Sequence, residues 1–115
     1  MAVTVFMRYP DLSLEQYGRI MAEMGLDANP PGGAILHIAA EGVDGIDVCE
    51  VWQTAGAAEG YIENRLRPVL EPHLHDPLAY RIEPLHNLFA PDIYAIERIG
   101  AVSLPAHLPG AAIAG

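Results

Sequence analysis

The chain has 115 residues, of which 51% are hydrophobic and 18% are charged, and its formal net charge is −9 at pH 7. A chain of this length forms one domain with a sizeable core. The acidic balance argues against a nucleic-acid partner and against docking on anionic lipid, because both need clustered Lys and Arg. Cys49 is the only cysteine, so an intrachain disulfide and a thiolate metal cluster are excluded.

The first residues are typical of a strand and not of a targeting segment. Residues 1–8 contain no basic stretch followed by a long apolar run, as a signal peptide would. No run in the chain approaches the roughly 18 apolar residues of a membrane span. We therefore expect a cytoplasmic protein that does not bind a membrane.

The first third of the chain predicts a strand followed by a helix. Residues 2–9 are rich in β-formers and end at a Tyr9-Pro10-Asp11 turn signal. Ser13 and Gln16 have the spacing of a capping box, which begins a helix that Gly25 ends. Apolar residues at intervals of three and four form one face of this helix, where we interpret them as core packing: Leu14, Tyr17, Ile20, Met21 and Met24.

The remainder of the domain predicts a hairpin, a second helix and a last strand. Strands are expected at about 34–40 and 46–53, with Ile46, Val48, Glu50 and Trp52 on one face of the second. A helix is expected at about 55–67, capped by Thr54. Prolines should then kink and end this helix, and a fourth strand is expected at about 79–89.

This order is β-α-β-β-α-β, which predicts an α+β fold of the ferredoxin-like kind with a four-stranded antiparallel sheet. Both helices must cover one face of the sheet, and the other face also carries large apolar residues. A second copy is the simplest cover, so we expect a homodimer with its two sheets face to face and a cavity in each subunit. The domain should span residues 1–90. The extension at 91–115, with a short strand at 93–96, should pack on the body or on the partner.

Two histidines stand in apolar runs, His37 within residues 34–40 and His86 within residues 84–89. A desolvated imidazole needs a partner or a purpose, and histidine is the side chain best suited to move protons near neutral pH. The alternative is a satisfied core histidine. We expect His37 and His86 to be catalytic, with Glu50 orienting the His37 ring and Asn87 donating a hydrogen bond. The hairpin register that decides whether Glu50 faces His37 does not follow from the sequence.

Several motifs together resemble a known superfamily. They are Leu36-His37-Ile38-Ala39, residues 47–54, Arg65-Leu66-Arg67-Pro68 and residues 85–89. In order and spacing, residues 2–90 resemble the dimeric α/β-barrel superfamily and, more closely, small uncharacterised proteins similar to antibiotic-biosynthesis monooxygenases. The resemblance implies an aromatic substrate bound by Trp52 and Tyr61, which are otherwise core residues. It disfavours haem degradation, because the first strand has no asparagine and His73 and His75 lie only near the haem-ligand position.

The expected function is therefore a cofactor-independent monooxygenase that acts on an apolar, aromatic or polyketide-like molecule. A proton-transfer cyclase or isomerase is the first alternative, and a non-catalytic ligand-binding or dimerisation module is the second. We expect no cofactor and no metal, because no Cys pair or helical His pair occurs. The His73-Leu74-His75-Asp76 cluster lies in a polar loop, where a solvated surface is the simpler interpretation.

Overall fold

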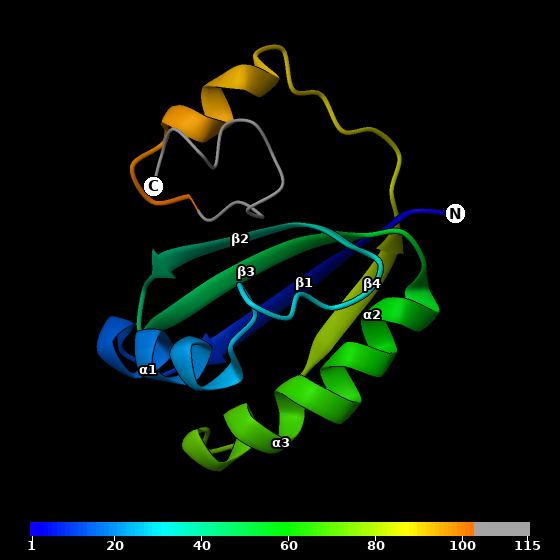
Figure 1. The fold of residues 1–115 in the computed structure, drawn as a ribbon. Coiled ribbons are helices and arrows are strands. Elements are labelled where there is room, and N and C mark those ends of the chain that lie inside the picture. Colours follow the sequence, from blue (N-terminus) through cyan, green and yellow to red (C-terminus); the bar gives the residue numbers. More distant parts are fainter. Residues whose placement is uncertain (103–115) are drawn as a thin grey trace.

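A computed structural model of the chain describes residues 1–102 and shows one sheet with helices on one side (Figure 1). The strands pair in the order β2-β3-β1-β4, and every pair is antiparallel. This is the predicted ferredoxin-like arrangement. The elements are β1 Val3–Pro10, α1 Leu14–Met24, β2 Ala34–Gly42, β3 Gly45–Trp52, α2 Ala55–Tyr61, a π-helix Ile62–Leu66, α3 Arg67–Leu70, a 3-10 turn Glu71–His73, β4 Tyr80–Pro84 and a 3-10 helix Ile93–Arg98.

Helix α1 begins and ends where its sequence predicts. The Ser13 hydroxyl accepts from the Gln16 amide at 3.1 Å, and the Gln16 side chain accepts from the Ser13 amide at 3.0 Å. Gly25 ends the helix in the left-handed conformation, with φ of 61°. The capping box and the glycine stop are both confirmed.

The second helical segment changes type along its length. Helix α2 ends at Tyr61, a π-helix follows over Ile62–Leu66, and α3 begins at Arg67. Pro68 has no amide hydrogen and its ring crowds the preceding turn, so the wider π spacing just before it relieves the clash. The irregularity expected from Pro68 is therefore present as a π-helix over Ile62–Leu66, between Tyr61 and the proline.

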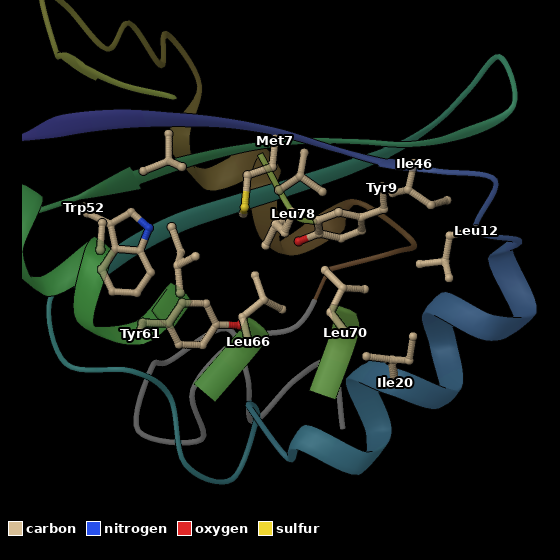
Figure 2. Close-up of a cluster of buried hydrophobic side chains, with 14 of the residues drawn as sticks. Met7, Tyr9, Leu12, Ile20, Ile46, Trp52, Tyr61, Leu66, Leu70 and Leu78 are labelled. Carbon is tan, nitrogen blue, oxygen red and sulfur yellow. The ribbon is translucent and has the colours of Figure 1, made fainter. Parts of the chain in front are cut away.

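The core lies between the sheet and the helices (Figure 2). Alternate side chains of β1 and β3 point toward the helices, as the period of two predicts. Most of the cluster is apolar, and its large, fully buried members include Trp52, Tyr9, Ile46, Ile62, Leu66 and Leu70. Glu50 is buried among them, at 4% exposure. The helix-facing side of the sheet thus combines an apolar core with a carboxylate.

The chain after β4 differs from the sequence expectation. The fourth strand ends at Pro84, not at 89, because β1 begins at Val3 and offers no partner beyond it. Residues 93–96 form part of a 3-10 helix instead of the predicted strand, and Asp92 caps that helix by accepting from the Ala95 amide at 3.1 Å. This extension passes over the face of the sheet opposite the helices (Figure 1). Residues 103–115 of the expected extension lie outside the described residues.

No helix within residues 1–102 combines the length and the apolar character needed to cross a membrane.

Candidate functional site

The pairing of β2 with β3 brings His37 directly opposite Glu50. The Nδ1 atom of His37 lies 2.6 Å from Oε2 of Glu50. A carboxylate oxygen only accepts, so Nδ1–H is the donor and the lone pair of the neutral ring is on Nε2. The Glu50 carboxylate is 4% exposed and the His37 side chain 38%. The predicted orienting contact is thus present, with the imidazole at the margin of the core.

The second oxygen of Glu50 is held from the same strand. The indole Nε1–H of Trp52 donates to Oε1 at 2.9 Å, and the two residues share a face because they are two apart on β3. A buried carboxylate is costly unless its oxygens are hydrogen-bonded. Both oxygens of Glu50 therefore have a donor, one from His37 and one from Trp52.

Tyr17 of α1 completes a chain of hydrogen bonds that the sequence did not reveal. Its hydroxyl lies 2.9 Å from Nε2 of His37. Burial, and then the negative charge of Glu50, raises the pKa of Tyr17 to about 12. Tyr17 thus keeps its proton at neutral pH, and its hydroxyl is the donor to Nε2 in the neutral tautomer of His37 that Glu50 orients. Helical periodicity placed Tyr17 on the apolar face, but only the packing of α1 on the sheet shows which side chain its hydroxyl meets.

Two more tyrosines surround this network. The Tyr61 ring lies 5.3 Å from the Trp52 ring, and the Tyr9 ring lies 6.2 Å from the Tyr17 ring, measured between centroids. Burial, followed by the charge of Glu50, raises the pKa of both Tyr9 and Tyr61. Figure 2 shows the Tyr9 and Tyr61 hydroxyls directed toward one another across the core.

These two hydroxyls border accessible space. Within residues 1–102, no hydrogen bond joins the hydroxyl of Tyr9 or of Tyr61 to another side chain or to the backbone. Yet every side-chain nitrogen or oxygen that is fully closed off in this part of the chain does have a partner. Water can therefore reach the two hydroxyls, although Tyr9 is only 1% and Tyr61 7% exposed.

The loop between α1 and β2 is fastened beside this group. Arg65, in the π-helix, donates to the Asn29 carbonyl at 3.1 Å, and its guanidinium lies 5.9 Å from the Tyr61 ring centroid. The Gln53 amide donates to the Gly33 carbonyl at 2.8 Å. A π segment inside a helix is frequent at functional sites, and here it follows Tyr61 directly.

His86 and Asn87 do not join the site. Both are exposed and follow β4, which is the edge strand opposite β2, and the chain there is irregular. The Leu85 amide donates to the Ala2 carbonyl at 3.0 Å, after which the sheet ends. The expectation that His86 sits in an apolar strand is wrong, because the strand has no partner at that point. The structure brings His37, Glu50, Trp52 and Tyr61 together, and leaves His86 and Asn87 apart.

Residues 1–102 contain no group of three His, Cys, Asp or Glu side chains placed to hold a metal ion. His73 and His75 are both exposed.

A hollow lies on the other face of the sheet. It has a volume of about 680 Å3, it is open to solvent, and Phe6, Ile38, Cys49 and Arg81 line part of it. The Arg81 guanidinium lies 4.2 Å from the Phe6 ring centroid. No side chain of the Glu50 network lines this hollow.

Comparison with known proteins identifies the fold. No family model matches the chain, and no curated protein matches its sequence. Solved structures do match it. A protein of unknown function from Nitrosomonas europaea superposes with a TM-score of 0.62 at 13% identity, over 78% of this chain and 94% of the other.

Two further matches carry a description of activity. A putative antibiotic biosynthesis monooxygenase from Chloroflexus aurantiacus has a TM-score of 0.55 at 12% identity, over 78% of this chain and 98% of its own. SnoaB from Streptomyces nogalater, a cofactor-independent oxygenase, has a TM-score of 0.56 at 12% identity, over 76% of this chain and 96% of its own. The chain therefore has the α+β fold of the antibiotic-biosynthesis-monooxygenase-like proteins, as the sequence motifs predicted.

Proposed function

We propose that this protein is a small-molecule enzyme that removes a proton from a planar aromatic or polyketide-like substrate and lets the resulting anion react with dioxygen without a cofactor. The observation that carries the proposal is the His37–Glu50 pair, set among aromatic side chains on the inner face of the sheet. A base in such surroundings, oriented by a buried carboxylate, is what abstraction of a proton from a weak acid requires.

Each of the four residues in the site has a role in this scheme. Nε2 of His37 is the proton acceptor, and Glu50 stabilises the imidazolium that forms. Trp52 holds the second oxygen of Glu50 and, with Tyr61, offers flat aromatic surface to a planar ring system. The polar groups of the site thus hold the proton, and the apolar core surrounds them.

The reaction balances for a substrate with an activated CH2 group. Proton removal gives a carbanion, which transfers one electron to dioxygen, and the two radicals combine into a peroxide anion. That anion takes back a proton, and the hydroperoxide loses water to leave a carbonyl group. In sum, one CH2 and one O2 give one C=O and one H2O. The fold match to a cofactor-independent oxygenase supports this chemistry over other proton-transfer reactions.

The test uses 1,8-dihydroxyanthrone, a planar compound with an acidic CH2 group, in chelator-treated buffer. Oxygen uptake should rise above the spontaneous rate, and the anthraquinone product should contain one atom from 18O2. His37→Gln should lower the enzymatic rate by about a hundredfold or more. His75→Gln, which alters an exposed histidine in a loop, is the matched control and should match the wild type.

The same experiment separates the alternatives. A cyclase or isomerase would exchange the CH2 protons for deuterium under argon, with dependence on His37, but would consume no oxygen. A ligand-binding module would bind the probe and do neither. Oxygen uptake that is equal in the wild type and in His37→Gln would contradict the proposal.

We also propose that the protein is a homodimer formed through the face of the sheet opposite the helices. Apolar side chains are exposed on this face of the sheet and in the extension that passes over it. Ile38 on the sheet is 52% exposed, and in the extension Phe89 is 79% exposed and Tyr94 76%. Large apolar side chains exposed in this way favour an association site.

A further inference from the structure

Tyr17 has no role in the proposed function, yet it occupies the one nitrogen that the reaction needs. His37 has two ring nitrogens, and Nδ1 is bound to Glu50. Nε2 lies 2.9 Å from the Tyr17 hydroxyl. A substrate proton can reach Nε2 only through this hydroxyl or by displacing it.

We propose that Tyr17 receives the proton of the bound substrate and passes its own proton to His37. This inference rests on the proposed function and adds to it the residue that contacts the acidic group. Tyr17 would thus be a catalytic residue, and His37 would act through it.

Tyr17 connects the buried phenols to His37, because its ring lies 6.2 Å from the Tyr9 ring, measured between centroids, and its hydroxyl lies 2.9 Å from Nε2 of His37. The pKa of Tyr9 is raised by burial, then by Glu50, and then by the nearby phenols of Tyr17 and Tyr61. The three phenols are therefore neighbours. Figure 2 shows the Tyr9 and Tyr61 hydroxyls directed toward one another within the core, whereas His37 stands on the edge strand β2 at the margin of the core.

The transfer is balanced in atoms and charge. The bond between the substrate and its proton breaks, and an O–H bond forms on Tyr17. The original O–H bond of Tyr17 breaks, and an N–H bond forms at Nε2. The substrate keeps the electron pair as an anion, and His37 becomes an imidazolium ion against the Glu50 carboxylate. No oxidant or other reactant takes part, and the Tyr9 and Tyr61 hydroxyls are available as donors to the anion.

The protonated state of Tyr17 in the free protein fits this role. Its pKa of about 12, raised by burial and by Glu50, means that the phenol holds a proton to hand on at neutral pH. Glu50 disfavours a lasting tyrosinate, so the proton gained from the substrate stays on Tyr17. The pair of transfers therefore leaves Tyr17 neutral before and after the step.

The test uses 4-nitrophenol, an acidic phenol whose neutral and ionised forms absorb at different wavelengths. The probe is bound to the full-length protein at a pH where it is mostly neutral in solution. Wild-type protein should bind it partly ionised. Tyr17→Phe should still bind it, with the ratio of ionised to neutral bound probe lowered about tenfold or more. Tyr80→Phe, which removes a hydroxyl that donates to Glu63 at 3.1 Å on another part of the fold, should match the wild type.

The outcomes separate the inference from the proposed function. If Tyr17→Phe ionises the probe as well as the wild type or better, His37 takes the proton directly and the inference is overturned, while the role of His37 stands. If the wild type does not bind the probe, or binds it without ionising it, both the proposed function and the inference are contradicted. Circular dichroism and thermal unfolding of each variant show that a lost signal does not come from a lost fold.

Discussion

The two faces of the sheet use their side chains in opposite ways. The face toward the helices buries Glu50, the one buried charged residue within residues 1–102, and gives both of its oxygens a donor. The outer face leaves Ile38 52% exposed beside an open hollow. A buried charge with hydrogen-bond partners favours a functional role. Burying a charge costs stability, and a core can pack without one. Exposed apolar groups outside it indicate association.

The largest effect on the inner face is expected from Glu50→Gln. With the new amide oxygen facing Trp52 Nε1–H, the amide NH2 faces Nδ1 of His37, which must then accept, so the ring proton moves to Nε2 and Nε2 is no longer an acceptor. We expect the oxygen uptake with 1,8-dihydroxyanthrone to fall about a hundredfold. The free energy of unfolding should fall by about 1–3 kcal/mol, measured by urea denaturation.

Glu83→Gln is the matched control, because Glu83 is exposed on β4 and lies 3.6 Å from exposed Arg81. It should change neither quantity measurably. Equal activity in the Glu50 and Glu83 variants would remove the functional contrast between the two faces.

On the outer face, Ile38→Glu should abolish self-association. A carboxylate at this position would be desolvated in an interface between two sheets, which is costly for an unpaired charge. Sedimentation velocity should show a dimer for the wild type and a monomer for Ile38→Glu. Val43→Glu, an acid substitution at an 81% exposed position in the hairpin turn, should remain dimeric. A wild-type monomer at every concentration would contradict the assignment of this face.

Trp52→Phe tests whether the aromatic wall and the second donor to Glu50 contribute together. The substitution keeps a ring but removes Nε1–H, so Oε1 of Glu50 loses its partner. We expect about a tenfold loss of oxygen uptake and a loss of about 1–3 kcal/mol in the free energy of unfolding. If stability falls and turnover does not, Trp52 is a core residue only.

The phenols of the inner face should make stability fall at high pH. The pKa of Tyr17 is raised from 10.0 to about 12, and burial raises those of Tyr9 and Tyr61 as well. The folded state therefore holds these protons more tightly than the unfolded state. The contribution of Tyr17 is complete below pH 10 and is lost as pH rises from there through 12, whereas those of Tyr9 and Tyr61 are lost at still higher pH. The melting temperature should decline over this interval, and the tyrosinate absorbance should rise steeply where unfolding begins. Tyrosinate that forms fully near pH 10 in a folded protein would contradict the burial of these phenols.

The smallest effect is expected from His86→Ala. The residue is exposed and lies beyond the last strand, so the rate of oxygen uptake should stay within about twofold of the wild type. A loss as large as that of His37→Gln would restore the catalytic role that the sequence suggested for His86, and would show that the contrast between the two histidines is wrong.

Local signals in the sequence predicted the order of the elements and the ends of α1. The capping box at Ser13 and the glycine stop at Gly25 depend only on residues close in sequence, so they can be read directly. The hairpin turn is of the same kind. Asp44 adopts the left-handed conformation, with φ of 57°, and a Cβ on Gly45 would meet the Tyr9 carbonyl oxygen at 2.5 Å.

The site itself depends on distances that no local signal encodes. His37 faces Glu50 because the register of β2 against β3 runs unbroken from Gly42 opposite Gly45 to Leu36 opposite Val51, and the bulge between Ala34 and Leu36 lies beyond it. One residue of slip would turn His37 to the other face of the sheet. Tyr17 could be placed on the apolar side of its helix, but its partner depends on how the helix packs. His86 has apolar neighbours like those of His37, and differs only because β1 does not extend far enough to pair with it.

The most direct measurement is a crystal structure of the protein with 1,8-dihydroxyanthraquinone, which resembles the substrate but has no CH2 group to oxidise. We expect its rings to lie against Trp52 and Tyr61, with a ligand oxygen within hydrogen-bond distance of the Tyr17 hydroxyl. Binding only in the outer hollow, against Phe6, Ile38 and Cys49, would contradict it.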